Sequence, residues 1–122
     1  MTDLKPVKVD KWSPDHRKQE STSKAGWTWL VTDVIAKAEE LPVIEVPLQH
    51  MYIDYKLGKM PIRNFVEHMK NVMDADLDCP IIADYDGVLF DGRHRLAKAL
   101  YEGRTTVKMK RFEDYLPPSF RK

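Results

Sequence analysis

The chain has 122 residues and a mass of 14.3 kDa, with 43% hydrophobic and 32% charged residues. These values exclude a wholly disordered chain and fit one folded domain with a single core. No apolar run approaches the roughly 18 residues that span a bilayer, residues 1–12 lack the apolar stretch of a secretory signal, and the single cysteine, Cys79, excludes an internal disulfide framework. We therefore expect a cytoplasmic protein with no membrane partner.

Residues 1–24 are polar and contain Pro6 and Pro14, which predicts a flexible N-terminal arm. The following segment predicts a helix, because its apolar residues recur at spacings of three and four. These residues are Trp27, Leu30, Val31, Val34, Ile35 and Ala38. Pro42 is expected to end this helix.

The middle of the chain alternates between strand and helix patterns. Residues 43–47 are short and β-branched, which predicts a strand, and the apolar spacing of residues 62–73 predicts a second helix. Residues 80–83 and 88–90 predict two strands. The turn between them, Asp84–Gly87, is typical of a hairpin because Asp-Gly tolerates positive φ angles.

Residues 93–102 predict a third helix that ends at Gly103, and residues 105–109 predict a last strand. Residues 117–122 are expected to form a basic tail. Because helices and strands interleave, we predict an α+β fold with a small mixed sheet and packed helices. A single domain is expected over residues 25–116.

Charge is distributed unevenly along the chain. Residues 92–122 contain 9 lysines and arginines against 3 acidic residues, a net charge of +6, whereas the whole chain has +1. A basic end of this kind indicates a surface for an anionic partner, or a solvated tail that improves solubility. Composition leaves both interpretations open.

The most informative segment runs from Val88 to Gly103 and reads as strand, glycine turn and helix. Such a turn directs the first amide groups of the helix toward a position that favours anions. Gly92 would let a ligand approach the backbone. Arg93, His94 and Arg95 oppose the helix dipole in the first turn, which indicates a bound phosphate unless Asp91 neutralises them as a local ion pair.

Asp91-Gly92-Arg93-His94-Arg95-Leu96-Ala97-Lys98-Ala99 resembles the signature of the ParB/sulfiredoxin-like superfamily, and the order of predicted elements is similar over residues 43–112. In ParB proteins the corresponding motif binds the phosphates of CTP. Sulfiredoxins carry a catalytic cysteine where this chain has Arg93. Because their chemistry needs that thiol, we exclude sulfiredoxin activity.

The resemblance implies a nucleotide-binding domain with phosphates at Gly92, Arg93, His94 and Arg95. A nucleoside triphosphate, CTP or ATP with Mg²⁺, is the implied ligand. NTP hydrolysis and kinase-type phosphoryl transfer both stay open, with Asp91 and Glu45 as the candidate catalytic carboxylates. The short, single-domain form of the motif is similar to stand-alone ParB-like domains of phages and plasmids.

Two alternatives involve macromolecular partners. Lys108, Lys110 and Arg111 around the last strand are candidate nucleic-acid contacts, in a DNA-binding or nuclease-like accessory protein. The arm and first helix, with Trp27 and Trp29, would be the docking surface of a non-catalytic adaptor that binds a host protein. The four histidines have no metal-ligand spacing, so no protein-held metal site is predicted.

Overall fold

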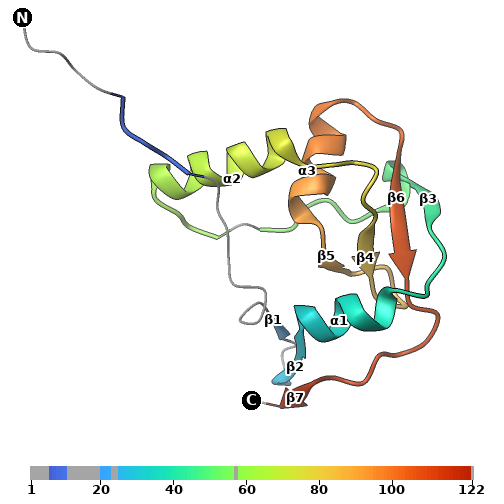
Figure 1. Ribbon diagram of the computed structural model, residues 1–122. Coiled ribbons are helices and arrows are strands. Elements are labelled where there is room, and N and C mark those ends of the chain that lie inside the picture. The colour runs from blue at the N-terminus through green and yellow to red at the C-terminus, as the bar shows by residue number, and fades with distance from the viewer. Residues whose placement is uncertain (1–5, 11–19, 23–24, 57, 122) are drawn as a thin grey trace, which may run out of the picture.

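The computed structural model describes residues 6–10, 20–22, 25–56 and 58–121 (Figure 1). Its elements in chain order are β1 (Glu20–Thr22), β2 (Trp27–Leu30), α1 (Val31–Ala38), β3 (Ile44–Pro47), the short 3₁₀ helix η2 (Leu48–His50), α2 (Ile62–Asp74), β4 (Ile81–Ala83), β5 (Leu89–Asp91), α3 (Arg93–Tyr101), β6 (Thr106–Arg111) and β7 (Phe120–Arg121). They form a four-stranded sheet of order β3-β6-β4-β5 and a three-stranded sheet of order β1-β2-β7.

The four-stranded sheet is mixed. Strand β6 pairs antiparallel with β3 and parallel with β4, while β4 and β5 form an antiparallel hairpin. Helix α3 joins β5 to β6, which lies on the other side of β4, and a tight turn connects only adjacent antiparallel strands. The predicted α+β class with a small mixed sheet is therefore confirmed.

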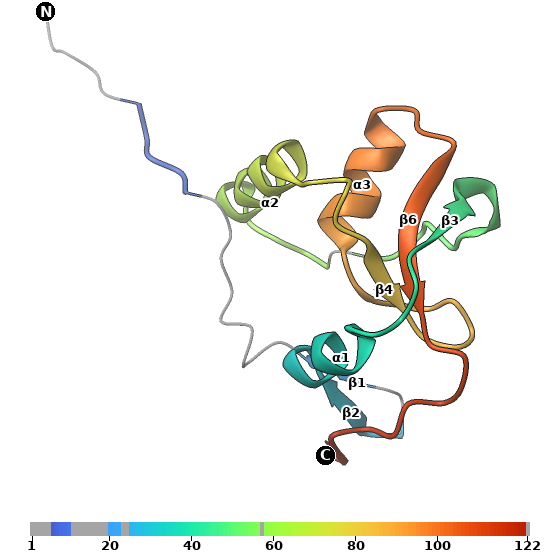
Figure 2. The ribbon, with the colours of Figure 1, turned by 45° about the vertical axis from the view of Figure 1, so that its right-hand side comes forward.

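Side chains that alternate along β4 build the core on both faces of this sheet. Ile81 and Ala83 pack with Leu96 and Ala99 of α3, and Ile82 faces the opposite side. There it packs with α1 and the segment after β6, in a cluster of Val34, Ala38, Phe112 and Leu116. In Figure 2 the three-stranded sheet lies beside α1, and α2 lies on the outer side of α3.

The hairpin turn predicted at Asp84–Gly87 is present. Asp84 Oδ1 accepts hydrogen bonds from the backbone N–H groups of Asp86 and Val88, each at 2.8 Å. Gly87 adopts a φ of +85°, which only glycine enters at little cost. Hydrogen bonds within the turn therefore stabilise it, and the chain continues from it into β5.

Gly92 connects β5 to α3 with a φ of +111°. A Cβ atom at this position would lie 2.5 Å from Cγ2 of Ile81, a fully buried residue of β4. The absence of a side chain therefore serves the packing of the helix start against β4. This packing role stands beside the predicted role of Gly92 in letting a ligand approach the backbone, which stays a prediction.

Residues 27–30 form strand β2, so the predicted helix begins only at Val31, and the prediction for Trp27–Leu30 is wrong. Strand β2 pairs with β1 on one side and β7 on the other. Trp29 packs inward: its Nε1 donates to the Leu116 carbonyl at 2.8 Å, and its ring contacts Phe90. These partners are distant in sequence, and they outweigh the local helical spacing.

Both ends of the chain contribute strands where an arm and a tail are predicted. Residues 20–22 form β1, and residues 120–121 form β7. Residues 6–10 lie beside α2, where the carbonyls of Lys8 and Val9 accept hydrogen bonds from Arg63 and Lys70. The remainder of the predicted arm, residues 1–5, 11–19 and 23–24, lies outside the described residues.

Helix α2 covers part of α3 and is exposed on its other side. Ile62, Phe65, Met69 and Met73 follow one stripe of this helix and keep 44–84% of their surface exposed. Among the described residues, no helix combines the length and apolar character needed to span a membrane.

Candidate functional site

The site predicted at Gly92–Arg95 is the first turn of α3. This helix has no side-chain N-cap and no acidic residue in its first turn. The amide groups at a helix start have no acceptor within the helix, and the helix dipole makes this end positive. Three basic residues therefore stand where an acidic or hydroxyl side chain is usually found.

Arg95 is engaged by the protein itself. Its Nη2 forms an ion pair with Asp91 Oδ2 at 2.9 Å, and its Nη1 donates to the Pro80 carbonyl and to Cys79 Sγ. The side chains of Arg95 and Asp91 are only 20% and 23% exposed. The local ion pair that sequence analysis left open is therefore present, and it fastens the start of α3 to the segment before β4.

Replacing Arg95 with alanine is expected to lower the free energy of unfolding by about 1–3 kcal/mol, because Asp91 and the Pro80 carbonyl lose a charged partner in a half-buried site. Arg104→Ala is the matched control, since Arg104 pairs with Glu102 while 56% exposed. Exposed pairs of this kind contribute about 0–1 kcal/mol. Equal urea midpoints for the two variants would contradict the role given to Arg95.

His94 pairs with a residue that sequence analysis did not select. Its Nε2 lies 2.7 Å from Nδ1 of His68 on α2, and the two ring centroids are 5.0 Å apart. Burial lowers the pKa of His94, and the charges of His68 and Arg95 lower it further, while Asp91 opposes them. An anion bound beside His94 would favour the protonated form of this imidazole.

Lowering the pH is expected to destabilise the ligand-free protein through His94. The pKa of His94 lies below its ordinary value of 6.5 in the folded state, so the unfolded chain binds more protons as the pH falls past 6.5. The stability that neutral His94 contributes is present above pH 6.5 and is lost as the pH falls through the lowered pKa. Melting temperatures between about pH 7.5 and about pH 5.5 should fall less steeply for His94→Gln than for the parent, and identical slopes would refute this assignment.

Arg93 is the exposed cation of the site. Its Cζ lies 5.6 Å from the centroid of the Tyr55 ring, a distance at which a guanidinium and an aromatic face attract. Tyr55 is itself held in place, because its hydroxyl accepts a hydrogen bond from the Leu89 N–H at 2.9 Å. Within the described residues, Arg93 forms no ion pair. Its charge is therefore available to a ligand at the start of α3.

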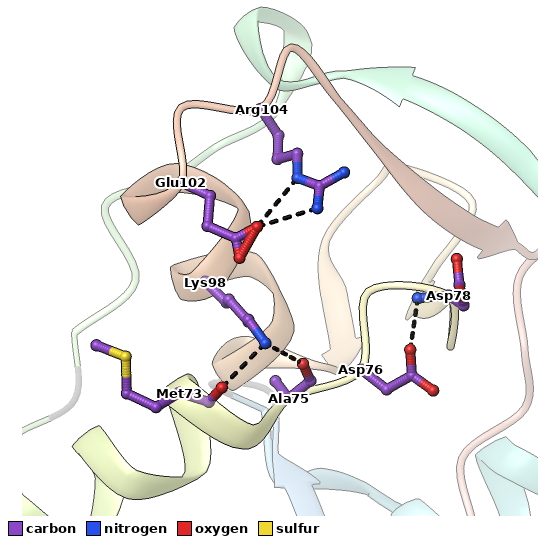
Figure 3. Close-up of polar contacts among 7 residues, drawn as sticks. All are labelled: Met73, Ala75, Asp76, Asp78, Lys98, Glu102 and Arg104. Carbon is purple, nitrogen blue, oxygen red and sulfur yellow. Dashed lines mark hydrogen bonds and ion pairs between the residues drawn. The ribbon is translucent and has the colours of Figure 1, made fainter.

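Lys98 holds α2 against α3 and so keeps His68 at His94. Its Nζ donates to the Met73 carbonyl at 2.9 Å and the Ala75 carbonyl at 2.7 Å, at the end of α2 (Figure 3). Cationic groups at a helix C-terminus interact favourably with its last carbonyls. Two helices distant in sequence thus meet at both a lysine and a histidine contact.

Glu45, the predicted second catalytic carboxylate, is not near Asp91. It lies on β3 and lines a cleft of about 280 Å³ together with Lys98, Ala99 and Glu102 from the C-terminal half of α3. Two carboxylates in this cleft already have hydrogen-bond partners: Glu102 accepts from Arg104, and Asp76 Oδ1 accepts from the backbone N–H of Asp78 (Figure 3). The two carboxylates proposed from sequence therefore stand at opposite ends of α3.

The cations of β6 are dispersed as well. Lys108 forms an ion pair with Asp78 at 3.1 Å, Lys110 donates to the Glu39 carbonyl, and Arg111 donates to the Tyr85 carbonyl. Strand alternation places Lys108 and Lys110 on one face and Arg111 on the other. The structure does not bring the three together into one patch, and a nucleic-acid interface there stays a prediction.

Asp91 is the carboxylate nearest the start of α3, and Arg95 holds it. In the described part of the chain, no cluster of three or more histidine, cysteine, aspartate or glutamate residues is suited to a metal ion. Mg²⁺ is usually bound by one or two carboxylates together with substrate phosphates, so the Mg²⁺ ion implied by the resemblance stays a prediction.

Comparison with protein-family models, with curated proteins and with solved structures finds no match for this chain. The resemblance to the ParB/sulfiredoxin-like superfamily therefore rests on the motif and on the order of elements, and it stays a prediction.

Proposed function

We propose that the chain is a nucleotide-binding domain of the ParB/sulfiredoxin-like type, which holds the phosphates of a nucleoside triphosphate at the start of α3. The observation that carries this proposal is the first turn of that helix. It places Arg93 and the His94–His68 pair at a positive helix end with no acidic residue in the turn and no side-chain cap.

Cations in the first turn of α3 have an electrostatic cost in the ligand-free protein. Each cation in the first turn of a helix costs about 0.3–1 kcal/mol when exposed, and a fold that needed only a stable helix start would have an acidic or hydroxyl residue there. A bound phosphate makes the charges of Arg93 and of a protonated His94 favourable. The amide groups at the helix start also donate hydrogen bonds to the phosphate. The arrangement is unfavourable alone and favourable with an anion.

The residues around the site divide into two roles under this proposal. Arg93 and a protonated His94, which contacts His68, neutralise the phosphates. Gly92 orients the helix through its contact with Ile81, and the Asp91–Arg95 pair keeps the turn rigid. The proposal is limited to binding, because Glu45 lies at the other end of α3 and Asp91 is held by Arg95.

Calorimetric titration of the whole chain with ATP, CTP, GTP and inorganic triphosphate, with and without Mg²⁺, tests the proposal. We expect saturable binding that weakens as salt rises. Binding should also weaken as the pH rises above the pKa of His94, because the neutral imidazole no longer attracts the anion. No detectable binding of any polyphosphate at low salt and mildly acidic pH would overturn the proposal.

A further inference from the structure

A second cleft is lined in part by Tyr55, the residue whose ring contacts Arg93 of α3. It encloses about 430 Å³ between the segment that follows β3 and the Asp84–Gly87 turn, with Met109 of β6 also in its lining. Clefts that bind small molecules range from about 300 to about 1,000 Å³, so this one is large enough for a nucleoside.

The cleft has an aromatic wall that is open to a ligand. Tyr52 and Tyr55 line it in an edge-to-face pair, with ring centroids 5.0 Å apart and an interplanar angle of 86°. Tyr52 is 60% exposed, and Val88, which also lines the cleft, is 52% exposed. Large apolar surfaces that stay exposed in a concave site favour a flat apolar partner.

Polar and ionisable side chains also line the cleft and could form hydrogen bonds to a ligand. Arg111 supplies a guanidinium, Asp86 a carboxylate and His50 an imidazole. Arg111 already donates to the Tyr85 carbonyl, which fixes it against the turn. A ligand with a planar ring that carries both hydrogen-bond donors and acceptors would match this mixed set, as the nucleobases do.

Tyr55 joins the cleft to the phosphate site. One residue lines the cleft, contacts Arg93 across its ring, and holds the start of β5 through the Leu89 N–H. From there β5 leads directly into Gly92 and α3. Tyr55 is therefore common to the cleft and to the surroundings of Arg93.

We infer that this cleft binds the base of the nucleotide whose phosphates lie at α3, with Tyr52 as the stacking surface. The inference rests on the proposed function, because it assigns the second half of the same ligand. Its consequence is selectivity: a nucleoside triphosphate should bind more tightly than inorganic triphosphate, since only the former fills the cleft.

The test compares ATP and CTP with inorganic triphosphate on the parent chain and on three variants. Stacking on one aromatic side chain is expected to contribute about tenfold in affinity, or about 1.4 kcal/mol. Tyr52→Ala should bind the nucleotides about tenfold more weakly than the parent and bind triphosphate equally well. Tyr52→Phe should behave as the parent, because among the described residues the Tyr52 hydroxyl bonds only to the exposed Asp54 carbonyl. Tyr101→Ala removes an exposed tyrosine outside the cleft and should also bind as the parent.

Two results would overturn the inference in different ways. Equal affinity of the parent for nucleotides and triphosphate, or unchanged nucleotide binding by Tyr52→Ala, would exclude the cleft and leave the phosphate site standing. Failure of the parent to bind either compound would remove the proposed function, and the base site with it.

Discussion

Replacing Gly92 with alanine is expected to lower the free energy of unfolding by about 2–6 kcal/mol. Two costs combine. A non-glycine residue at a φ of +111° is strained by about 1–3 kcal/mol. The new Cβ would lie 2.5 Å from Cγ2 and 2.9 Å from Cβ of the buried Ile81, and overpacking of this kind costs about 1–3 kcal/mol. Urea denaturation of the purified variant measures the sum.

Gly103→Ala separates these two costs. Gly103 also has a positive φ, +71°, but a Cβ built there meets no atom within 4 Å. Gly103→Ala should therefore lower the free energy of unfolding only by the cost of backbone strain, about 1 kcal/mol. If the two variants were equally destabilised, steric contact with Ile81 would not be the reason for the glycine at position 92.

Arg93→Glu is expected to weaken nucleotide binding by at least about 100-fold, because close charge pairs of this type contribute about 3 kcal/mol or more and the reversal turns attraction into repulsion. The same substitution should leave the ligand-free fold as stable as the parent, or raise its stability by about 0.3–1 kcal/mol, since an acidic residue in the first helical turn interacts well with the dipole. Loss of binding with gain of stability is the signature of a residue retained for a ligand.

Arg104→Glu is the control for Arg93→Glu, because it makes the same change of net charge beyond the other end of α3. Isothermal titration of both variants with the same nucleotide gives the comparison. If Arg104→Glu weakened binding as much as Arg93→Glu, the effect would be one of overall charge, and the site at the start of α3 would be rejected.

Local sequence signals account for α3 and its surroundings. The glycine between a short apolar strand and a periodic segment predicts the β5–α3 turn, and Asp91 and Arg95 flank this turn only four residues apart. The Asp84–Gly87 turn likewise depends on neighbouring residues. These features form from interactions within a few residues, so the sequence predicts them directly.

Features that depend on distant partners were missed. Trp27, Leu30 and Val31 match helical spacing, yet pairing with β1 and β7 makes residues 27–30 a strand. His68 reaches His94 only because α2 packs on α3, across 26 residues of sequence. Tyr55 comes from a segment with no periodic pattern. Helical and alternating patterns report only on neighbouring residues, so they do not identify contacts of this kind.

An amide NMR titration of the whole chain with inorganic triphosphate at low salt tests the phosphate site most directly. We predict saturable shifts that are largest for the backbone amides of residues 92–96, with accompanying changes in the ring signals of His68 and His94. Shifts that are largest around Lys108 and Lys110 of β6, or no saturable shift at all, would contradict a phosphate site at the start of α3.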